Sequence, residues 1–175
     1  MDINGKTIWQ VAAGDGKNTD FVDLCLEKDV IVFGPGRHGP WPDCKIPMLA
    51  DTETPWTTTK AGIIKRFAED LKPRDLVVLR IGTQKVYAVG EIVGDYGFSE
   101  LFGKVETSTN GVTWDLQHYR RVRWLWHQDG EPKVFPVYAL KFGSSVQHLI
   151  SSEVRDWLNL LDIPEEAYDR SLLPL

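Results

Sequence analysis

Residues 29–41, DVIVFGPGRHGPW, place the tightest constraint on how this chain can fold. A short apolar run leads into Gly34-x-Gly36-x-x-Gly39, the glycine spacing of a dinucleotide-binding turn. That turn works only when it opens a helix whose N-terminus holds the pyrophosphate. The prolines on either side of Trp41 remove backbone donors and clash with a helix interior, so no helix can run through them. We therefore predict a rigid Gly/Pro loop (residues 34–42) after a strand, and no cofactor.

The rest of the chain has the pattern of short strands with helices between and after them. Apolar runs and alternation predict six strands, at residues 6–13, 30–33, 76–80, 86–93, 118–126 and 134–141. Helical spacing and capping residues predict three helices, at residues 19–28, 58–71 and 152–161. The proline-broken chain up to Thr57 and the polar segment 98–115 are expected to be loops. The predicted class is α+β, a small twisted mixed β-barrel with flanking helices.

Length predicts the domain organisation. A chain of 175 residues can form one domain that buries most of its apolar surface. No internal repeat or low-complexity segment divides it. We assign residues 1–165 to a single domain and residues 166–175 to a tail or the start of a linker.

Composition narrows the classes of partner and compartment. The net charge of −5 argues against a protein that holds nucleic acid mainly by neutralising phosphates, so nucleic-acid binding requires a local patch and a specific pocket. No apolar run approaches the roughly 20 residues of a membrane span, and the start MDINGKTIWQ does not resemble a signal peptide. Two cysteines indicate no disulfide framework. We therefore expect a cytoplasmic protein that does not contact a membrane.

The sequence carries no pattern that favours catalysis or metal binding. His38, His118, His127 and His148 occur in four different contexts, and none has metal-ligand spacing with the cysteines. Two acid-x-Lys triplets, DCK at 43–45 and EPK at 131–133, have the form used in metal-dependent nuclease cores. Such triplets are common in a chain with 25 acidic residues. We expect a protein that is not an enzyme and has no metal site.

Seven tryptophans are unusual in a chain of this length. Those in periodic apolar segments are explained by a core. Trp41, Trp56 and Trp114 lie in polar or proline-rich chain, where an exposed indole costs solubility unless it packs on something. Flat aromatic faces stack on nucleobases or form cages around methylated groups. These three residues therefore indicate an aromatic-lined pocket.

Three segments, in this order, carry a family resemblance: IWQVAAGDG at 8–16, IIKRFAEDLKPRDLVVLRIGTQKVYAVGEIVGDYGF at 63–98, and HYRRVRWL at 118–125. Together they combine Lys-Pro-x-Asp-Leu-Val after a helix, a hairpin, Gly-Glu-Ile-x-Gly-Asp-Tyr and Tyr-Arg-x-Val-x-Trp. This combination resembles the PUA-like superfamily and, within it, the EVE-like domains. These include the modified-base readers at the N-termini of McrBC-type modification-dependent restriction systems. The resemblance is weakest at residues 34–57 and 99–115.

The resemblance implies a mixed barrel that accepts one flipped-out base in a concave pocket. The implied function is a non-catalytic specificity domain that reads a modified base in double-stranded DNA. The base is N6-methyladenine, 5-methylcytosine or 5-hydroxymethylcytosine, and the implied partner is an ATPase or nuclease domain or subunit of a restriction complex. Two other interpretations stay open: a PUA-like module that binds RNA or nucleotides, and an interaction module that kept the fold and lost the pocket.

We place the base pocket between the end of the first strand, the Gly/Pro loop and the corner at residues 94–96. The expected base-pocket residues are Trp41, Trp56, Asp95, Tyr96, Gly14, Gly34 and Phe33. The tryptophans and the tyrosine are expected to stack on the base, Asp95 to accept from an exocyclic amine, and the glycines to permit close backbone approach. The expected phosphate contacts are Arg37, Lys104, Arg121 and Arg123.

Overall fold

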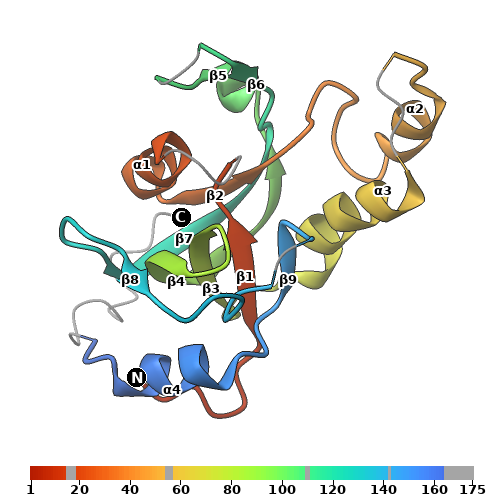
Figure 1. Cartoon of the computed structure of the whole chain (residues 1–175). Helices are drawn as coiled ribbons and strands as arrows, with labels where there is room; N and C mark the ends of the chain where they lie inside the picture. Colours follow the sequence, from red (N-terminus) through yellow and green to blue (C-terminus); the bar gives the residue numbers. More distant parts are fainter. Residues whose placement is uncertain (15–18, 54–56, 109–110, 142, 164–175) are drawn as a thin grey trace.

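The computed structural model describes residues 1–14, 19–53, 57–108, 111–141 and 143–163. One mixed sheet dominates it (Figure 1), built from β1 (Ile8–Ala12), β2 (Val30–Phe33), β3 (Leu76–Ile81), β4 (Lys85–Phe98), β7 (His118–His127), β8 (Lys133–Val134) and β9 (Val146–His148). Hydrogen-bonded neighbours follow the order β2-β7-β4-β3-β1-β9, and β8 pairs with β4. In this sheet β1 and β3 are parallel, and the other pairs are antiparallel. With the helices, this confirms the α+β class.

The described helices lie around the sheet: α1 (Asp20–Lys28), α2 (Lys45–Ala50), α3 (Thr58–Lys65) and α4 (Ser152–Leu160). α3 continues into a π-helical turn at Arg66–Asp70, and a 3-10 turn forms at Glu100–Phe102. In Figure 1, α1 lies beside β2, and α4 lies at the end of the molecule opposite the hairpin of β5 (Val105–Glu106) and β6 (Thr113–Trp114). Within the described part of the chain, no helix has the length and apolar character needed to cross a membrane.

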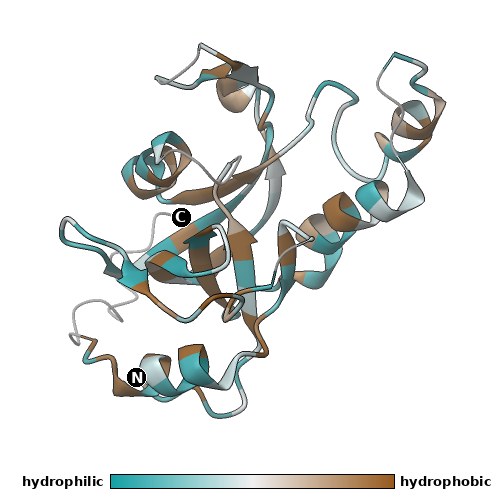
Figure 2. Ribbon diagram, viewed as in Figure 1, coloured by the Kyte–Doolittle hydropathy of each residue, from teal (hydrophilic) through white to brown (hydrophobic). Residues whose placement is uncertain are grey.

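Both faces of the sheet are covered. In β3, Val77 and Leu79 belong to a core shared with α1 and the π-helical turn, whereas Leu76 and Val78 belong to a second core shared with α4. Successive side chains of a strand point to opposite faces, so a strand covered on both sides needs buried side chains throughout. Every residue of β3 is buried accordingly. Figure 2 shows brown hydrophobic segments within the sheet and alternating colours along the helices.

The outermost strands of the path, β2 and β9, are not joined by a ladder of described residues, so the sheet is open and the expected closed barrel is not confirmed. The π-helical turn lies against both strands instead. Phe67 stacks on Phe33 of β2 with ring centroids 5.6 Å apart. Arg66 donates from Nη1 to the Val146 carbonyl oxygen of β9 at 2.7 Å. Helical side chains therefore connect two edges that a barrel joins through backbone hydrogen bonds.

Arg120, in β7, fastens the π-helical turn to the sheet. It is 2% exposed. Its guanidinium donates to the carbonyl oxygens of Phe67 at 3.2 Å, Ala68 at 2.6 Å and Gly94 at 3.4 Å. Gly94 lies in the irregular part of β4, where the register with β7 shifts. Burial lowers the pKa of Arg120, while the charge of nearby Asp95 acts in the opposite direction.

The structure departs from the expected elements in several places. α2 forms in chain expected to be broken by prolines, because Pro47 lies in its first turn, where a missing N–H removes no helical hydrogen bond. The expected loop at 98–115 contains the β5–β6 hairpin. The expected strand at 134–141 is reduced to β8, and β9 forms later in the chain. The return strand of the hairpin, expected to end at Val93, continues to Phe98 as β4.

We expect Arg120→Met to lower the free energy of unfolding by about 3 kcal/mol, because buried carbonyl groups lose a charged donor. Urea denaturation followed by tryptophan fluorescence measures this loss. Arg121→Met is the matched control, since the neighbouring side chain is exposed and its loss is expected to change stability by less than about 0.5 kcal/mol. Equal losses in the two variants would contradict the role assigned to Arg120.

Candidate functional site

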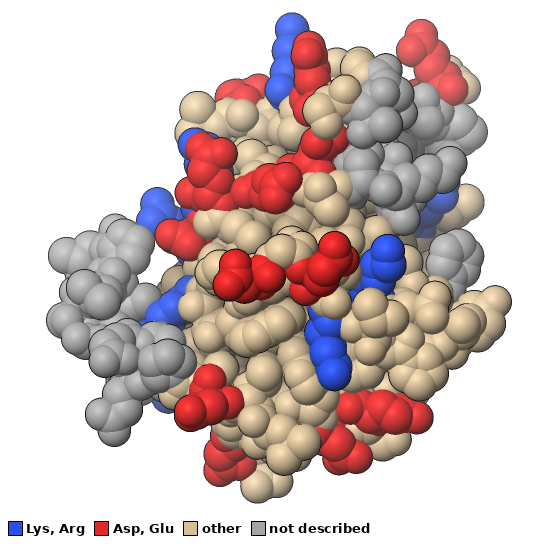
Figure 3. Space-filling model, turned by 60° about the vertical axis from the view of Figure 1, so that its left-hand side comes forward, with Lys and Arg blue, Asp and Glu red and all other residues tan. Residues whose placement is uncertain are grey.

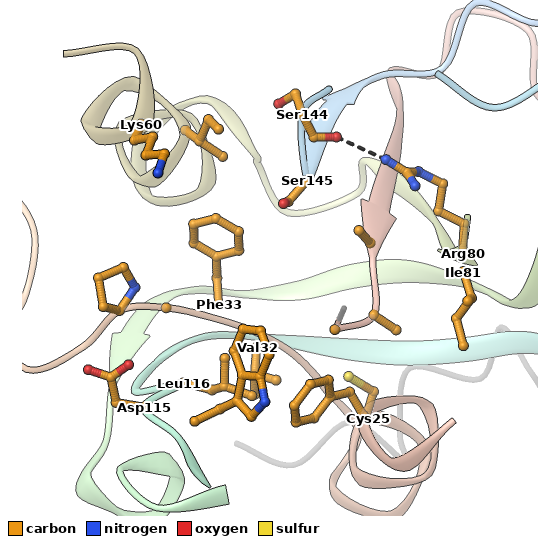
Figure 4. Close-up of a pocket in the computed structure, with 18 of the residues that line it drawn as sticks. Cys25, Val32, Phe33, Lys60, Arg80, Ile81, Asp115, Leu116, Ser144 and Ser145 are labelled. Atoms are coloured by element: carbon orange, nitrogen blue, oxygen red, sulfur yellow. Dashed lines mark hydrogen bonds between the residues drawn. The ribbon is translucent and has the colours of Figure 1, made fainter. Parts of the chain in front are cut away.

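A cavity of about 770 Å³ lies where β1, β2 and β3 end (Figure 4), and we call it the strand-end cavity. β1 and β3 run parallel, so their last residues lie together on one wall. The end of β2, α1, the start of α3, the Gly/Pro loop and the segments 114–116 and 143–145 supply the other walls. Ligand sites commonly form as concavities of this size, with apolar walls and a few convergent polar groups.

Gly34 allows two segments distant in sequence to meet at this cavity. A Cβ on Gly34 would lie 2.2 Å from the carbonyl oxygen of Asp115, so a larger residue does not fit there. The Gly36 N–H donates to the same carbonyl at 3.0 Å, and the Arg37 N–H donates to Oδ2 of Asp115 at 3.0 Å. No helix starts among the glycines of the Gly/Pro loop and runs through Pro40 and Pro42, as the prolines predicted; α2 begins only at Lys45. These glycines allow close packing against segment 114–116.

His118, fully buried at the start of β7, also holds the Gly/Pro loop in place. Its Nε2 lies 3.0 Å from the Pro35 carbonyl oxygen, and its Nδ1 lies 2.7 Å from the Tyr96 hydroxyl. A carbonyl oxygen only accepts, so Nε2 carries the hydrogen and Nδ1 accepts from Tyr96. The Tyr96 hydroxyl in turn accepts from the Trp41 N–H at 2.9 Å. Burial lowers the pKa of His118, which favours this neutral form.

One part of the strand-end cavity is aromatic and apolar. Trp114 lines it and meets Phe21 of α1 edge to face, with ring centroids 5.5 Å apart. Figure 4 places Val32 and Leu116 in the same part, with Phe33 standing beside them. These side chains offer flat and apolar faces against which a planar ligand can pack.

The other part of the cavity is polar and is built by the start of α3 and segment 143–145. In Figure 4, Lys60, Ser144 and Ser145 lie on the opposite side of Phe33 from the apolar group. The cavity therefore presents different chemistry at its two ends. A ligand that fills both parts needs one planar or apolar portion and one portion that forms hydrogen bonds.

Arg80 supports the wall of the polar part. It is 4% exposed and donates to the Ser144 carbonyl oxygen at 2.9 Å, drawn in Figure 4, and to the Gly82 carbonyl oxygen at 2.7 Å. Burial lowers the pKa of Arg80 to about 10, so the guanidinium stays charged at neutral pH. It therefore brings positive charge to this wall as well as fixing its backbone.

Four of the expected site residues line the strand-end cavity: Gly14, Phe33, Gly34 and Arg37. Gly14 has φ +77°, and a Cβ there would lie 1.9 Å from a ring carbon of Phe21, so the position requires glycine. Arg37 is exposed at the rim, and its Nη2 lies 3.1 Å from Oδ2 of Asp51. The end of the first strand and the Gly/Pro loop thus both border the cavity, as expected.

The expected corner at residues 94–96 does not border it. β4 continues through this corner and pairs Tyr96 with Arg120 of β7, which carries the tyrosine into the His118 network. Trp41 lies outside the cavity lining as well, and its indole donates to Oε1 of Glu69 at 2.6 Å. Asp95 is exposed in the irregular part of β4. Trp56 lies outside the described residues.

The four expected phosphate contacts lie on different segments: the Gly/Pro loop, the chain before β5, and β7. Arg123 donates to Oε1 of Glu91 at 3.0 Å, and Arg121, which comes earlier in β7, is exposed. Lys104 is exposed beside β5, and Arg37 lies at the cavity rim. Figure 3 shows acidic side chains spread over the coloured part of one face, with lysines and arginines scattered among them. A broad electrostatic surface for nucleic acid is absent from that part of the molecule.

Several cavity residues carried weaker signals in the sequence. Trp114 stood out as an indole in polar chain, but its place in the fold depends on the contact between Asp115 and the Gly/Pro loop. Arg80 interrupts an otherwise apolar strand, and a buried charge of this kind needs partners that the sequence does not reveal. Lys60 and Ser145 lie in segments whose composition is ordinary for a surface.

The two thiols are poor candidates for nucleophiles. Cys25 lines the cavity, and burial raises its pKa to about 12, so little thiolate forms at neutral pH. Cys44, which the sequence placed in a polar loop, is buried against Met48 and Ile64, and burial raises its pKa. No group of three His, Cys, Asp or Glu among the described residues could hold a metal ion. The cavity offers aromatic faces for stacking and polar groups for hydrogen bonding.

Residues 9–146 match the model of a family described as a domain of unknown function, DUF8426. The chain belongs to this family. The match begins in β1 and ends in β9, so it contains every residue that lines the strand-end cavity and leaves out α4. No curated protein shows a significant match to the chain.

We expect the free energy of unfolding to fall as the pH drops from about 7.5 to 5.5. In the unfolded chain a histidine takes up a proton near pH 6.5, its ordinary pKa being about 6.5, whereas His118 in the folded state does so only at lower pH. This contribution to stability is complete above the unfolded pKa and is lost as the pH falls toward the folded one. Urea denaturation at a series of pH values measures the profile.

His118→Gln is expected to lower stability overall and to flatten this part of the profile, because the group that titrates is gone. His127→Gln, at an exposed position of the same strand, is the control and should keep the slope of the parent chain. If the free energy of unfolding of His118→Gln depended on pH as steeply as that of the parent chain, the assignment of this pH dependence to His118 would be contradicted.

Proposed function

We propose that this chain is a non-catalytic domain that receives one nucleobase, flipped out of nucleic acid, in the strand-end cavity. The cavity itself carries the proposal. Its volume of about 770 Å³ lies in the range of ligand sites, and it combines aromatic faces with hydrogen-bonding groups. A base has the same combination, a flat ring with a polar edge.

The energetics favour a pocket with these walls. Flipping a base costs a few kcal/mol, which the pocket must offset. Stacking on an aromatic side chain contributes roughly 1–3 kcal/mol per base, and Trp114 and Phe33 both line the cavity. Asp115 lines it too, and one of its carboxylate oxygens already accepts from Arg37, which orients the other for a donor on the base edge.

The ligand class we favour is a modified base in double-stranded DNA, because the segments that resemble EVE-like readers include β1 and β3, two of the three strands that bound the cavity. On this proposal the open sheet is a variant of the PUA-like barrel, in which the π-helical turn takes the place of the closing ladder. The chain acts in the cytoplasm as the specificity element of a restriction system, and an ATPase or nuclease domain or subunit supplies the cutting.

A second candidate is binding of RNA or of a free nucleotide. Arg80 and Lys60 bring positive charge to the polar part of the cavity, and that charge favours a ligand with a phosphate group. Competition between modified duplex, matched RNA and free nucleoside monophosphates separates the two candidates.

We expect the chain to bind one short duplex more tightly when its central base is modified. The set contains unmodified DNA, N6-methyladenine, 5-methylcytosine and 5-hydroxymethylcytosine, measured by fluorescence anisotropy at low and moderate salt. Trp114→Ala should weaken the preferred duplex by about tenfold or more, because one stacking face is lost. Trp41→Ala is the matched control: its indole lies outside the cavity lining, so binding should change little.

Two results would contradict the proposal. One is equal, weak binding of all duplexes that disappears as salt rises, since that behaviour belongs to phosphate contacts alone. The other is a preference that depends on Trp41 and not on Trp114, since the base would then bind outside the strand-end cavity.

A further inference from the structure

We infer that the base read by the strand-end cavity carries a hydroxyl-bearing adduct larger than a methyl group, with the adduct directed to the polar part. This inference rests on the proposed function and names its substrate class. Three features of the cavity support it: its volume, the separation of its two chemistries, and the hydroxyl-bearing residues that line the polar part.

The volume exceeds what a methylated base fills. The cavity has room for on the order of 25 water molecules at roughly 30 Å³ each, whereas 5-methylcytosine has about nine non-hydrogen atoms. A pocket that selects a methyl group needs atoms in contact all around it, because a gap forfeits dispersion contacts. The space beyond the aromatic part therefore suits a larger substituent on the base.

Hydroxyl groups line that space. The Ser145 side chain faces the cavity across from Phe33 (Figure 4), and no described residue forms a hydrogen bond with its Oγ. Its neighbour differs, because Ser144 Oγ donates to the Val146 carbonyl oxygen at 2.9 Å. Thr57 and Thr59 line the cavity from the start of α3, and Thr57 Oγ1 already accepts from the Lys60 N–H at 3.2 Å as the N-cap of this helix. Hydroxyls both donate and accept, so the Ser145 hydroxyl in particular matches a hydroxyl-bearing adduct and gains nothing from a methyl group.

The net charge of the protein also supports this inference. A chain of net charge −5 gains little affinity from DNA phosphates unless its basic side chains form a local patch, and the face drawn in Figure 3 carries acidic side chains with lysines and arginines scattered among them. Most of the binding free energy must then arise inside the cavity. A larger polar adduct forms additional hydrogen bonds and buries additional area inside the cavity, whereas a single methyl group forms no hydrogen bonds and buries little area.

The test uses one duplex with a single central cytosine in four forms: unmodified, 5-methyl, 5-hydroxymethyl and glucosylated 5-hydroxymethyl. We expect the glucosylated duplex to bind the whole chain at least about tenfold more tightly than the 5-methyl duplex. Ser145→Ala is expected to weaken the glucosylated duplex by about fivefold and to leave the 5-methyl duplex unchanged. Ser152→Ala, at an exposed position at the start of α4, is the control and should change neither.

The outcomes separate this inference from the proposed function. Equal or tighter binding of the 5-methyl duplex, weakened by Trp114→Ala, would overturn the inference and leave the proposed function standing. A preference for the glucosylated duplex that Ser145→Ala does not reduce would overturn the assignment of the adduct to the polar part. If no modified duplex binds better than the unmodified one and Trp114→Ala has no effect, both fail.

Discussion

The packing of the Gly/Pro loop against segment 115–118 is the interaction on which the rest of the molecule depends. Backbone groups outside a sheet or helix need other partners when they are buried. For the Gly/Pro loop, these partners are the carbonyl oxygen and the carboxylate of Asp115 and the ring of His118. Because Gly34 and Gly36 have no side chains, the two segments can approach closely. The same contact brings the end of β2 next to Trp114, and the cavity exists between them.

Sequence periodicity predicted the elements whose pattern is long and regular. β3, β7, α1, the helical stretch from α3 through the π-helical turn, and α4 lie within a few residues of their expected positions, because burial on one or both faces imposes a visible spacing. The short strands β5, β6, β8 and β9 were missed or displaced. Two or three residues carry no period, and such strands form only because a neighbouring strand offers hydrogen bonds. The sequence pattern also did not predict the open sheet, because the opening depends on how Arg66 and Phe67 pack.

Part of the cavity lining was predictable, at positions where local geometry requires a particular residue type. Gly14 and Gly34 stood at the ends of strands, and the structure shows that no larger residue fits at either place. Trp41 and Tyr96 are expected in the pocket because of their rings, and the structure places both outside the strand-end cavity, in hydrogen bonds to each other and to Glu69 and His118. Nothing local distinguishes a ring that faces a cavity from one that closes a hydrogen-bond network. That distinction depends on contacts between segments far apart in sequence.

The acidity of the chain and the position of the cavity both affect how specifically the protein can bind DNA. Phosphate contacts raise affinity for every sequence alike, so a basic surface would increase non-specific binding along with specific binding. Here the nearby positive charges are either at the rim, as Arg37 is, or part of a wall, as Arg80 is. If the cavity receives a base as proposed, affinity and discrimination come from the same contacts. Weak attraction to unmodified DNA then becomes a source of specificity, because the competing sites are bound poorly.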